Sequence, residues 1–303
     1  MVEITCPVCS SDESSVLLTG QDHICGDSTT FRLVRCASCG LVYLNPRPDA
    51  GELSDHYAER YRQWQSVPAA GLAARFRALG SRRKARAVAG LAGAGRLLDV
   101  GCGYGDFLLS ARKCGFEPFG TELEPDQTRR AAAASGADVR AGEPDKCSFE
   151  PGSFDVVTMW HVLEHMEDPL GTLRAVRSLL KPGGLAVVAV PDAGSWAARI
   201  FGGYWAGYDM PRHLLDFSRQ TLEATLARAG FRTEQASYFM GTFDNVRISL
   251  EFLIQGEVRN ERLRSLLLKL VSFPLIRVAL TPAALILQRL GKGSVVTCFA
   301  RAA

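Results

Sequence analysis

The chain has 303 residues, 47% of them hydrophobic, which is enough for one large domain or for a domain with a small module. Its net charge of +3 is nearly balanced, so composition gives no support to a strongly charged partner such as nucleic acid. The first residues lack a basic stretch followed by an apolar run, and most of the nine cysteines are scattered, so we expect a reducing, cytoplasmic setting.

The cysteines near the start of the chain predict a metal-binding module. Two Cys-x-x-Cys pairs flank the 26 residues 10–35, and each pair can aim two thiolates at one ion. The predicted ligands are Cys6, Cys9, Cys36 and Cys39. We expect a zinc ribbon over residues 1–48, with a structural zinc ion and a short strand at 31–35. His23 and Cys25 lack ligand spacing, and few basic residues support the alternative of nucleic-acid contact.

Residues 49–90 are predicted to be largely helical. Three aromatic residues recur there at helical spacing: Tyr57, Tyr61 and Trp64. They fit either helix packing or the lining of a pocket. The basic run 75–86, which includes Lys84, is typical of a solvated helix face, with contact to an acidic substrate as the alternative.

The segment 97–105 predicts a site for a nucleotide-containing cofactor. An apolar strand leads into Asp99, and the glycines at 101, 103 and 105 allow a tight turn and the close approach of a ligand. A helix is expected at 106–114. A strand, a glycine turn and a helix N-terminus therefore meet at one place, which is the geometry of such sites.

Strands and helices alternate along the rest of the chain, which predicts an α/β fold with a doubly wound, mostly parallel sheet. Further strands are expected at 117–122, 138–141, 154–159, 185–190, 231–239 and 294–300. Helices are expected at 128–135 and 221–229. The cofactor-binding core then spans 91–241 and regains its last strand at 293–303, after an insertion at 242–292.

Four ordered features resemble the motifs of class I S-adenosylmethionine (SAM) methyltransferases. They are the glycine turn, the acid-terminated strand 117–122, the segments 153–159 and 161–165, and the segment 179–191. The resemblance implies a seven-stranded sheet with its last strand inserted between the fifth and sixth, and a lid at 49–90. It implies SAM binding by Asp99, Gly101, Cys102, Gly103, Tyr104, Glu122, Leu123, Met159 and Trp160. The carboxylate of Glu122 is expected to accept hydrogen bonds from the ribose hydroxyls.

The catalytic candidates follow the fourth and fifth strands of the expected core. They are His161, Glu164, His165 and His213. The first three have the spacing of one helical face, and all four are expected at the carboxyl edge of the sheet. They are similar to the metal-binding Glu-x-x-Glu-His motif and distant His of the O-methyltransferases of ubiquinone biosynthesis and of plant small RNAs, with His161 in place of the first Glu. A general base, a second divalent metal ion and a bracing role all stay open.

The insertion at 242–292 is rich in Leu, Ile and Val with basic residues interleaved. Lys269, Arg277 and two prolines interrupt its most apolar part, so no uncharged run reaches the ~20 residues that span a bilayer. The segment fits a helical cap or a dimer interface. Amphipathic helices that lie on a membrane or hold a lipid are the alternative, which would make the protein membrane-peripheral.

The resemblance favours a SAM-dependent methyltransferase that O-methylates a small molecule, such as a sugar, polysaccharide, lipid or natural-product intermediate. Chains that join a zinc ribbon to this domain resemble bacterial tailoring enzymes. Deoxysugar C-methylation is an alternative. So are a non-catalytic protein of this fold and an RNA or protein methyltransferase that uses the ribbon to bind its partner. Residues Met159, Trp160 and His161 stand where amino-group methyltransferases carry an Asn/Asp-Pro-Pro-Tyr motif.

Overall fold

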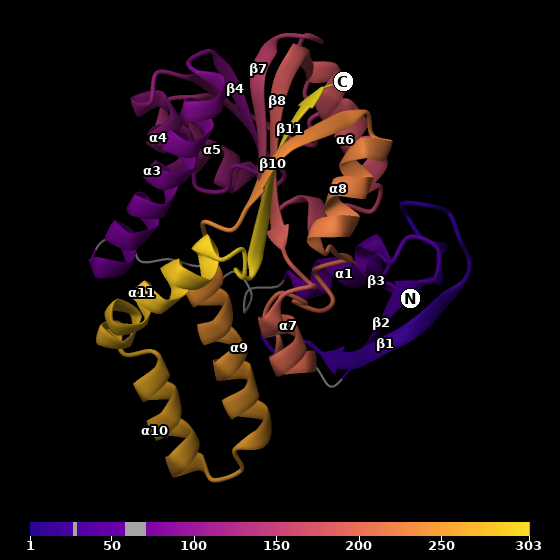
Figure 1. Cartoon of the computed structure of the whole chain (residues 1–303), viewed down its shortest axis with the longest axis vertical. Coiled ribbons are helices and arrows are strands. Elements are labelled where there is room, and N and C mark those ends of the chain that lie inside the picture. The colour runs from indigo at the N-terminus through magenta and orange to yellow at the C-terminus, as the bar shows by residue number, and fades with distance from the viewer. Residues whose placement is uncertain (27–28, 58–70, 303) are drawn as a thin grey trace. The chain divides into compact units, whose positions relative to one another are not determined.

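The computed structural model describes residues 1–26, 29–57 and 71–302 (Figure 1). The chain divides into two compact units, and each is assembled from three separate stretches of sequence. The first unit comprises Met1–Gln65, Val190–Leu222 and Ser237–Thr297. The second comprises Ser66–Ala189, Glu223–Ala236 and Cys298–Ala303.

A seven-stranded sheet forms the centre of the second unit, with the strand order β10-β11-β8-β7-β4-β5-β6. Its strands are β4 (Arg96–Val100), β5 (Glu117–Glu122), β6 (Asp138–Ala141), β7 (Phe154–Trp160), β8 (Leu180–Pro191), β10 (Phe231–Ser237) and β11 (Val295–Ala302). Strand β4 pairs in parallel with both β5 and β7, and β7 pairs in parallel with β8. The predicted doubly wound α/β fold is confirmed, including the place of the last strand between the fifth and sixth.

The helices of this core lie to either side of the sheet in Figure 1. They are α3 (Leu72–Ala92), α4 (Asp106–Lys113), α5 (Pro125–Ser135), α6 (Pro169–Leu179) and α8 (Arg219–Arg228). Because both faces are covered, the central strands are continuous apolar runs, and every residue from Leu185 to Val190 is buried. Strand β8 begins five residues before its predicted start, since Leu180 also pairs with Phe154 of β7.

A four-stranded sheet, in the order β1-β2-β3-β9, forms part of the first unit. Its strands are β1 (Ser14–Gln21), β2 (Thr30–Cys36), β3 (Val42–Leu44) and β9 (Leu215–Asp216). Strand β2 contains the strand that the sequence predicts at 31–35. Strand β9 comes from a distant part of the sequence and pairs antiparallel with β3, and the Leu44 N–H also donates to the Leu214 carbonyl over 3.0 Å.

The remaining elements of the first unit are helical. They are α1 (Ala50–His56), α7 (Trp196–Phe201), the 3₁₀ turn η2 (Gly202–Tyr204), α9 (Thr242–Glu257), α10 (Glu261–Val271) and α11 (Pro274–Arg289). Helices α1 and α3 agree with the helical prediction for 49–90, whereas Tyr61 and Trp64 lie outside the described residues. The insertion forms three helices, and no helix of the described chain is both long and apolar enough to cross a bilayer.

A buried arginine joins the ribbon sheet to the segment that carries β9. Arg212 is 1% exposed and donates to both carboxylate oxygens of Asp22 over 2.7 and 2.9 Å. It also donates to Asp209 over 2.6 Å and to the His56 carbonyl over 3.1 Å. Asp22 accepts further bonds from the Ile24 and Cys25 N–H groups, and a His56 ring nitrogen lies 3.0 Å away. The charge of the buried guanidinium is therefore balanced by carboxylates from two distant parts of the sequence.

The Asp22 carboxylate is ionised in this setting. Burial alone would raise its pKa, but the hydrogen bonds and the positive charge of Arg212 outweigh burial and lower the pKa from 3.8 to about 2. Folding therefore favours the charged form. The resulting stabilisation is complete above about pH 4 and is lost as the pH falls towards 2.

We expect Arg212→Met to lower the free energy of unfolding by about 3–5 kcal/mol, because it leaves the Asp22 and Asp209 carboxylates buried without their cation. Denaturant unfolding at neutral pH measures the loss. The matched control is Arg129→Met, which removes an exposed arginine paired with Asp126 and should cost less than about 1 kcal/mol. Equal effects of the two substitutions would contradict the role of the buried pair.

Candidate active site and cysteine cluster

The glycine turn after β4 has the backbone that its sequence predicts. Gly101, Gly103 and Gly105 have φ values of 66°, 55° and 79°, a region that side chains with a Cβ rarely adopt. A Cβ on Gly101 would lie 2.7 Å from a Val162 methyl carbon, whereas one on Gly103 would meet nothing within 4 Å. The turn is packed on one side and opens on the other, where a ligand can approach the backbone.

Glu122, the acid that ends β5, lies beside this turn. One carboxylate oxygen accepts a hydrogen bond from the Gly103 N–H over 2.8 Å, and the other accepts from the Leu123 N–H over 2.8 Å. These two bonds fix the carboxylate and leave lone pairs on both oxygens for further donors. The structure thus brings together the two features that the sequence predicted for the cofactor. Ribose binding by Glu122 stays a prediction.

Asp99 lies at the end of β4, just before the turn. It is 2% exposed and accepts a hydrogen bond from the Thr158 hydroxyl over 2.6 Å. Burial raises its pKa, although the Thr158 bond and the positive charge of Lys84 act in the opposite direction. This acid is therefore held inside the core, with a cation from α3 as its charged neighbour.

Lys84 is the functional candidate that the sequence did not single out. Its ammonium lies 4.6 Å from the centroid of the Trp160 ring, in a cation–π contact. Burial lowers its pKa, and the charges of Asp99 and Asp106 raise it. Within the described residues it has neither a hydrogen-bond acceptor nor an ion pair. An ammonium with three donors held above an aromatic ring at the mouth of the turn can receive an anion such as the carboxylate of an amino acid.

The basic run 75–86 was expected to be a solvated helix face, and Lys84 departs from that expectation. Arg82 and Arg83 are exposed, whereas Lys84 lies on the side of α3 that faces Trp160. Another basic residue of α3, Arg77, pairs with Asp106 at the start of α4 over 2.7 Å. The sequence alone gives no signal for this, because Lys84 stands in a basic run beside Arg82 and Arg83, which are exposed.

The other predicted cofactor residues differ in exposure. Cys102 is buried, and its N–H donates to the Thr121 carbonyl over 2.9 Å. Tyr104 and Leu123 are exposed beside the turn, whereas Met159 is fully buried in β7. Their contacts with a cofactor stay predictions.

The first three catalytic candidates follow β7 directly. His161 has a φ of 60°, which is rare for a residue with a Cβ and is a form of backbone strain found at functional sites. Its Nδ1 atom lies 3.2 Å from a carboxylate oxygen of Glu164, and that carboxylate is almost fully buried. Glu164 and His165 belong to the 3₁₀ turn η1 (Leu163–His165). The ring of His161 is 37% exposed, so it is both held by a carboxylate and open to solvent.

His213 belongs to the other unit. It is 8% exposed, and its Nδ1 atom lies 2.7 Å from the Gly207 carbonyl, which orients the ring. Its position follows β8, the strand beside β7 in the sheet. The predicted place of His213 beside the first three candidates stays a prediction.

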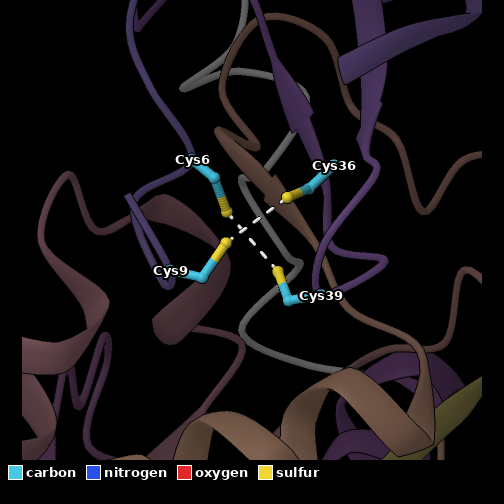
Figure 2. A group of neighbouring side chains, drawn as sticks. All are labelled: Cys6, Cys9, Cys36 and Cys39. Carbon is cyan, nitrogen blue, oxygen red and sulfur yellow. Dashed lines mark hydrogen bonds between the residues drawn. The ribbon is translucent and has the colours of Figure 1, made fainter. Parts of the chain in front are cut away.

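The four cysteines of the two pairs come together as the sequence predicts (Figure 2). Their sulfur atoms all lie within 4.8 Å of one another, with 3.5 Å between Cys6 and Cys39 and 3.4 Å between Cys9 and Cys36. A tetrahedral zinc site with bonds of about 2.3 Å needs sulfurs roughly 3.8 Å apart. None of the four forms a disulfide bond. The cluster has the donor set and the spacing that suit zinc.

Local backbone turns aim these thiols. The Ser10 N–H donates to the Cys6 carbonyl, and the Gly40 N–H donates to the Cys36 carbonyl, which closes a turn at each pair. Although burial opposes ionisation, hydrogen bonds from the Cys39 N–H and the Cys9 thiol lower the pKa of Cys36 to about 7. At least one thiolate is therefore readily available to a metal ion.

His23 and Cys25, which the sequence left outside the ligand set, lie outside the cluster. The Nε2 atom of His23 is 3.1 Å from the Gly203 carbonyl, and its ring stacks on Phe252 at 5.1 Å. Cys25 belongs instead to the group around Arg212.

A comparison with protein families matches residues 53–236, more than half of the chain, to the model described as a methyltransferase domain. The chain belongs to the methyltransferase-domain family. The family binds SAM. The open glycine turn and Glu122 suit the ribose of SAM. The ammonium of Lys84 suits its amino-acid end. SAM is accordingly the cofactor that this site fits.

Curated relatives include ubiquinone biosynthesis O-methyltransferases. That of Xanthomonas euvesicatoria pv. vesicatoria is 35% identical over 159 residues, which cover 48% of this chain and 66% of the relative. That of Cereibacter sphaeroides is 35% identical over 131 residues, which cover 41% of this chain and 53% of the relative. The chain therefore spans somewhat less than two thirds of the length of the relatives that it matches.

Solved structures show the same fold at low sequence identity. A SAM-dependent methyltransferase from Archaeoglobus fulgidus is 20% identical with a TM-score of 0.50, over 74% of this chain and 94% of that one. The [4+2]-cyclase SpnF is 19% identical with a TM-score of 0.50, over 84% of this chain and 97% of that one. Since a protein named as a cyclase shares the fold, the fold alone does not decide the reaction.

We expect Lys84→Met and Glu122→Ala each to weaken SAM binding roughly 10- to 100-fold, because each removes a charged partner of one end of the cofactor. Calorimetric titration with S-adenosylhomocysteine measures the affinity without turnover. Arg82→Met, which removes an exposed cation from the same helix, is the control and should bind normally. Unchanged affinity in Lys84→Met would refute the anion-binding role of this lysine.

Proposed function

We propose that the chain is a SAM-dependent O-methyltransferase that acts on the hydroxyl group of a small molecule. The contact between His161 and Glu164 carries the proposal, because it is the arrangement of a general base held by a buried carboxylate. The curated relatives, whose names state O-methylation, support the same reaction type.

The geometry suggests which atom accepts the proton. Glu164 is an acceptor when ionised, so a neutral His161 donates its Nδ1 proton to that carboxylate and keeps the lone pair on Nε2. Bound SAM supplies a methyl group on a sulfonium, which is already a strong electrophile. With SAM bound, Nε2 of His161 would take the proton of the acceptor hydroxyl, and the hydroxyl oxygen would receive the methyl group as the bond of that group to sulfur breaks.

A bound divalent metal ion is the alternative means of activating the hydroxyl. Glu164 and His165 are ligand types that suit a borderline metal, and His213 was predicted to join them. In that case a metal-bound hydroxyl loses its proton more readily, and His161 need not act as the base. The two mechanisms differ in their response to a chelator.

The contacts of the ribbon argue against its use as a module for recognising RNA or protein. Within the first unit, Asp22 binds Arg212 and β3 pairs with β9, so the ribbon sheet is occupied in holding residues 209–216. We propose that the ribbon is an internal brace for the segment that carries His213. The acceptor is then a small molecule of the sugar, lipid or natural-product type, with C-methylation of a deoxysugar as the alternative.

We propose further that Cys6, Cys9, Cys36 and Cys39 hold one structural zinc ion. Four thiolates complete a tetrahedron and leave no coordination position for a substrate. The sulfur spacing supports this assignment. Zinc would then stabilise the same unit that Arg212 stabilises.

We expect His161→Asn to lower the rate of methyl transfer by about 10²–10⁴ while the affinity for S-adenosylhomocysteine stays unchanged, because the base acts only on the acceptor proton. Single-turnover rates and calorimetry measure the two quantities. If a chelator abolished activity and an added divalent metal ion restored it, a metal ion rather than His161 would be the group that activates the hydroxyl. A His161→Asn protein with normal turnover contradicts the proposal.

We expect Cys36→Ser to abolish stoichiometric zinc and to destabilise the first unit, because three thiolates hold the ion less well than four. Elemental analysis and thermal unfolding measure the two effects. Cys114→Ser, which changes the cysteine at the C-cap of α4, is the control and should retain one zinc per chain. Absence of zinc from the wild-type chain purified without chelator would overturn the assignment.

A further inference from the structure

Helix α10 exposes a continuous apolar stripe. Leu263, Leu266 and Leu270 are 47%, 64% and 56% exposed, and Phe273, which follows the end of the helix, is 53% exposed. At 100° per residue the three leucines fall within an arc of about 60° on one side of the helix. Helix α10 has no buried residue among those described, although it lies antiparallel to α9 in Figure 1 and contacts it. The stripe is therefore a face that residues 1–26, 29–57 and 71–302 leave uncovered.

Positive charge lies along one side of this stripe. Residues 258–292 contain seven basic residues and one acidic residue, a net charge of +6 in a chain whose total is +3. The acidic residue, Glu261, lies 3.7 Å from Arg264 and is neutralised locally. Arg262 and Lys269 are exposed and lie on the same side of the stripe, about 70–90° from its centre.

We propose that α10 forms a docking surface for an anionic phospholipid bilayer. Leucine and phenylalanine side chains enter the boundary between headgroups and acyl chains, while arginine and lysine bind the phosphate groups above it. The chemistry is that of an amphipathic helix lying in the plane of the membrane.

A second copy of the chain fits this surface less well. In an antiparallel symmetric dimer, the same patch of both copies comes together, so the basic residues beside one stripe would meet those beside the other. Like charges brought together in this way oppose association. An anionic surface attracts the same basic residues. The observations therefore favour a membrane over a dimer.

The experiment is flotation of the full chain with vesicles of phosphatidylcholine mixed with phosphatidylglycerol, and with vesicles of phosphatidylcholine alone. We expect binding to the mixed vesicles that weakens as the salt concentration rises. Leu266→Gln with Leu270→Gln, and separately Arg262→Gln with Lys269→Gln, should each reduce binding at least about tenfold. Leu79→Gln is the matched control, because Leu79 is a helical leucine of similar exposure, 60%, on α3.

Thermal unfolding and the affinity for S-adenosylhomocysteine show that each variant is folded, and neither readout depends on vesicles. Equal binding of the double-leucine variant and Leu79→Gln, or equal binding to both kinds of vesicle, overturns the proposal. So does light scattering that shows a dimer which the double-leucine variant dissociates, with no vesicle binding by the wild type. That result would assign the surface to a second copy of the chain.

Discussion

The first unit depends on the buried charge of Arg212. A guanidinium that is 1% exposed is tolerated only with compensating carboxylates, and here Asp22 comes from the turn after β1 while Asp209 precedes Arg212 in its own segment. The ribbon contributes one of these carboxylates and the segment 209–216 contributes the other. The buried ion pair therefore requires two distant stretches of sequence to fold together, and β9 extends the ribbon sheet as a consequence.

In the second unit, the parallel sheet is the constraint on which the rest of the unit depends. The strands β8, β7, β4 and β5 run parallel, so they end at the same edge of the sheet. The glycine turn after β4, Glu122 at the end of β5 and His161 after β7 therefore lie at that edge. The hydrogen bond from the Gly103 N–H to Glu122 joins two of these endings directly. Topology thus gathers the cofactor residues, and strain at His161 sets the direction of the next segment.

The two units divide the chemistry between them. The second supplies the glycine turn, the ammonium of Lys84 and the pair His161–Glu164, whereas the first supplies the cysteine cluster, the brace around Arg212 and the exposed basic helices. The segment 258–292 carries a net charge of +6, so the rest of the chain carries −3. The nearly balanced charge of the whole chain therefore includes one strongly basic segment, which bears on where the protein meets a surface.

The sequence by itself determined the order and type of the core elements, the glycine turn and the four cysteines, because each is written in a local pattern of apolar spacing, glycines or paired ligands. It did not determine the partner of Lys84, the pairing of β9 with β3, or the ion pair of Arg212 with Asp22. These contacts join residues far apart along the chain, and no local pattern distinguishes a lysine that faces an indole ring from its solvated neighbours. Only the tertiary structure decides which side of α3 is covered, because the covering residues arrive from another strand.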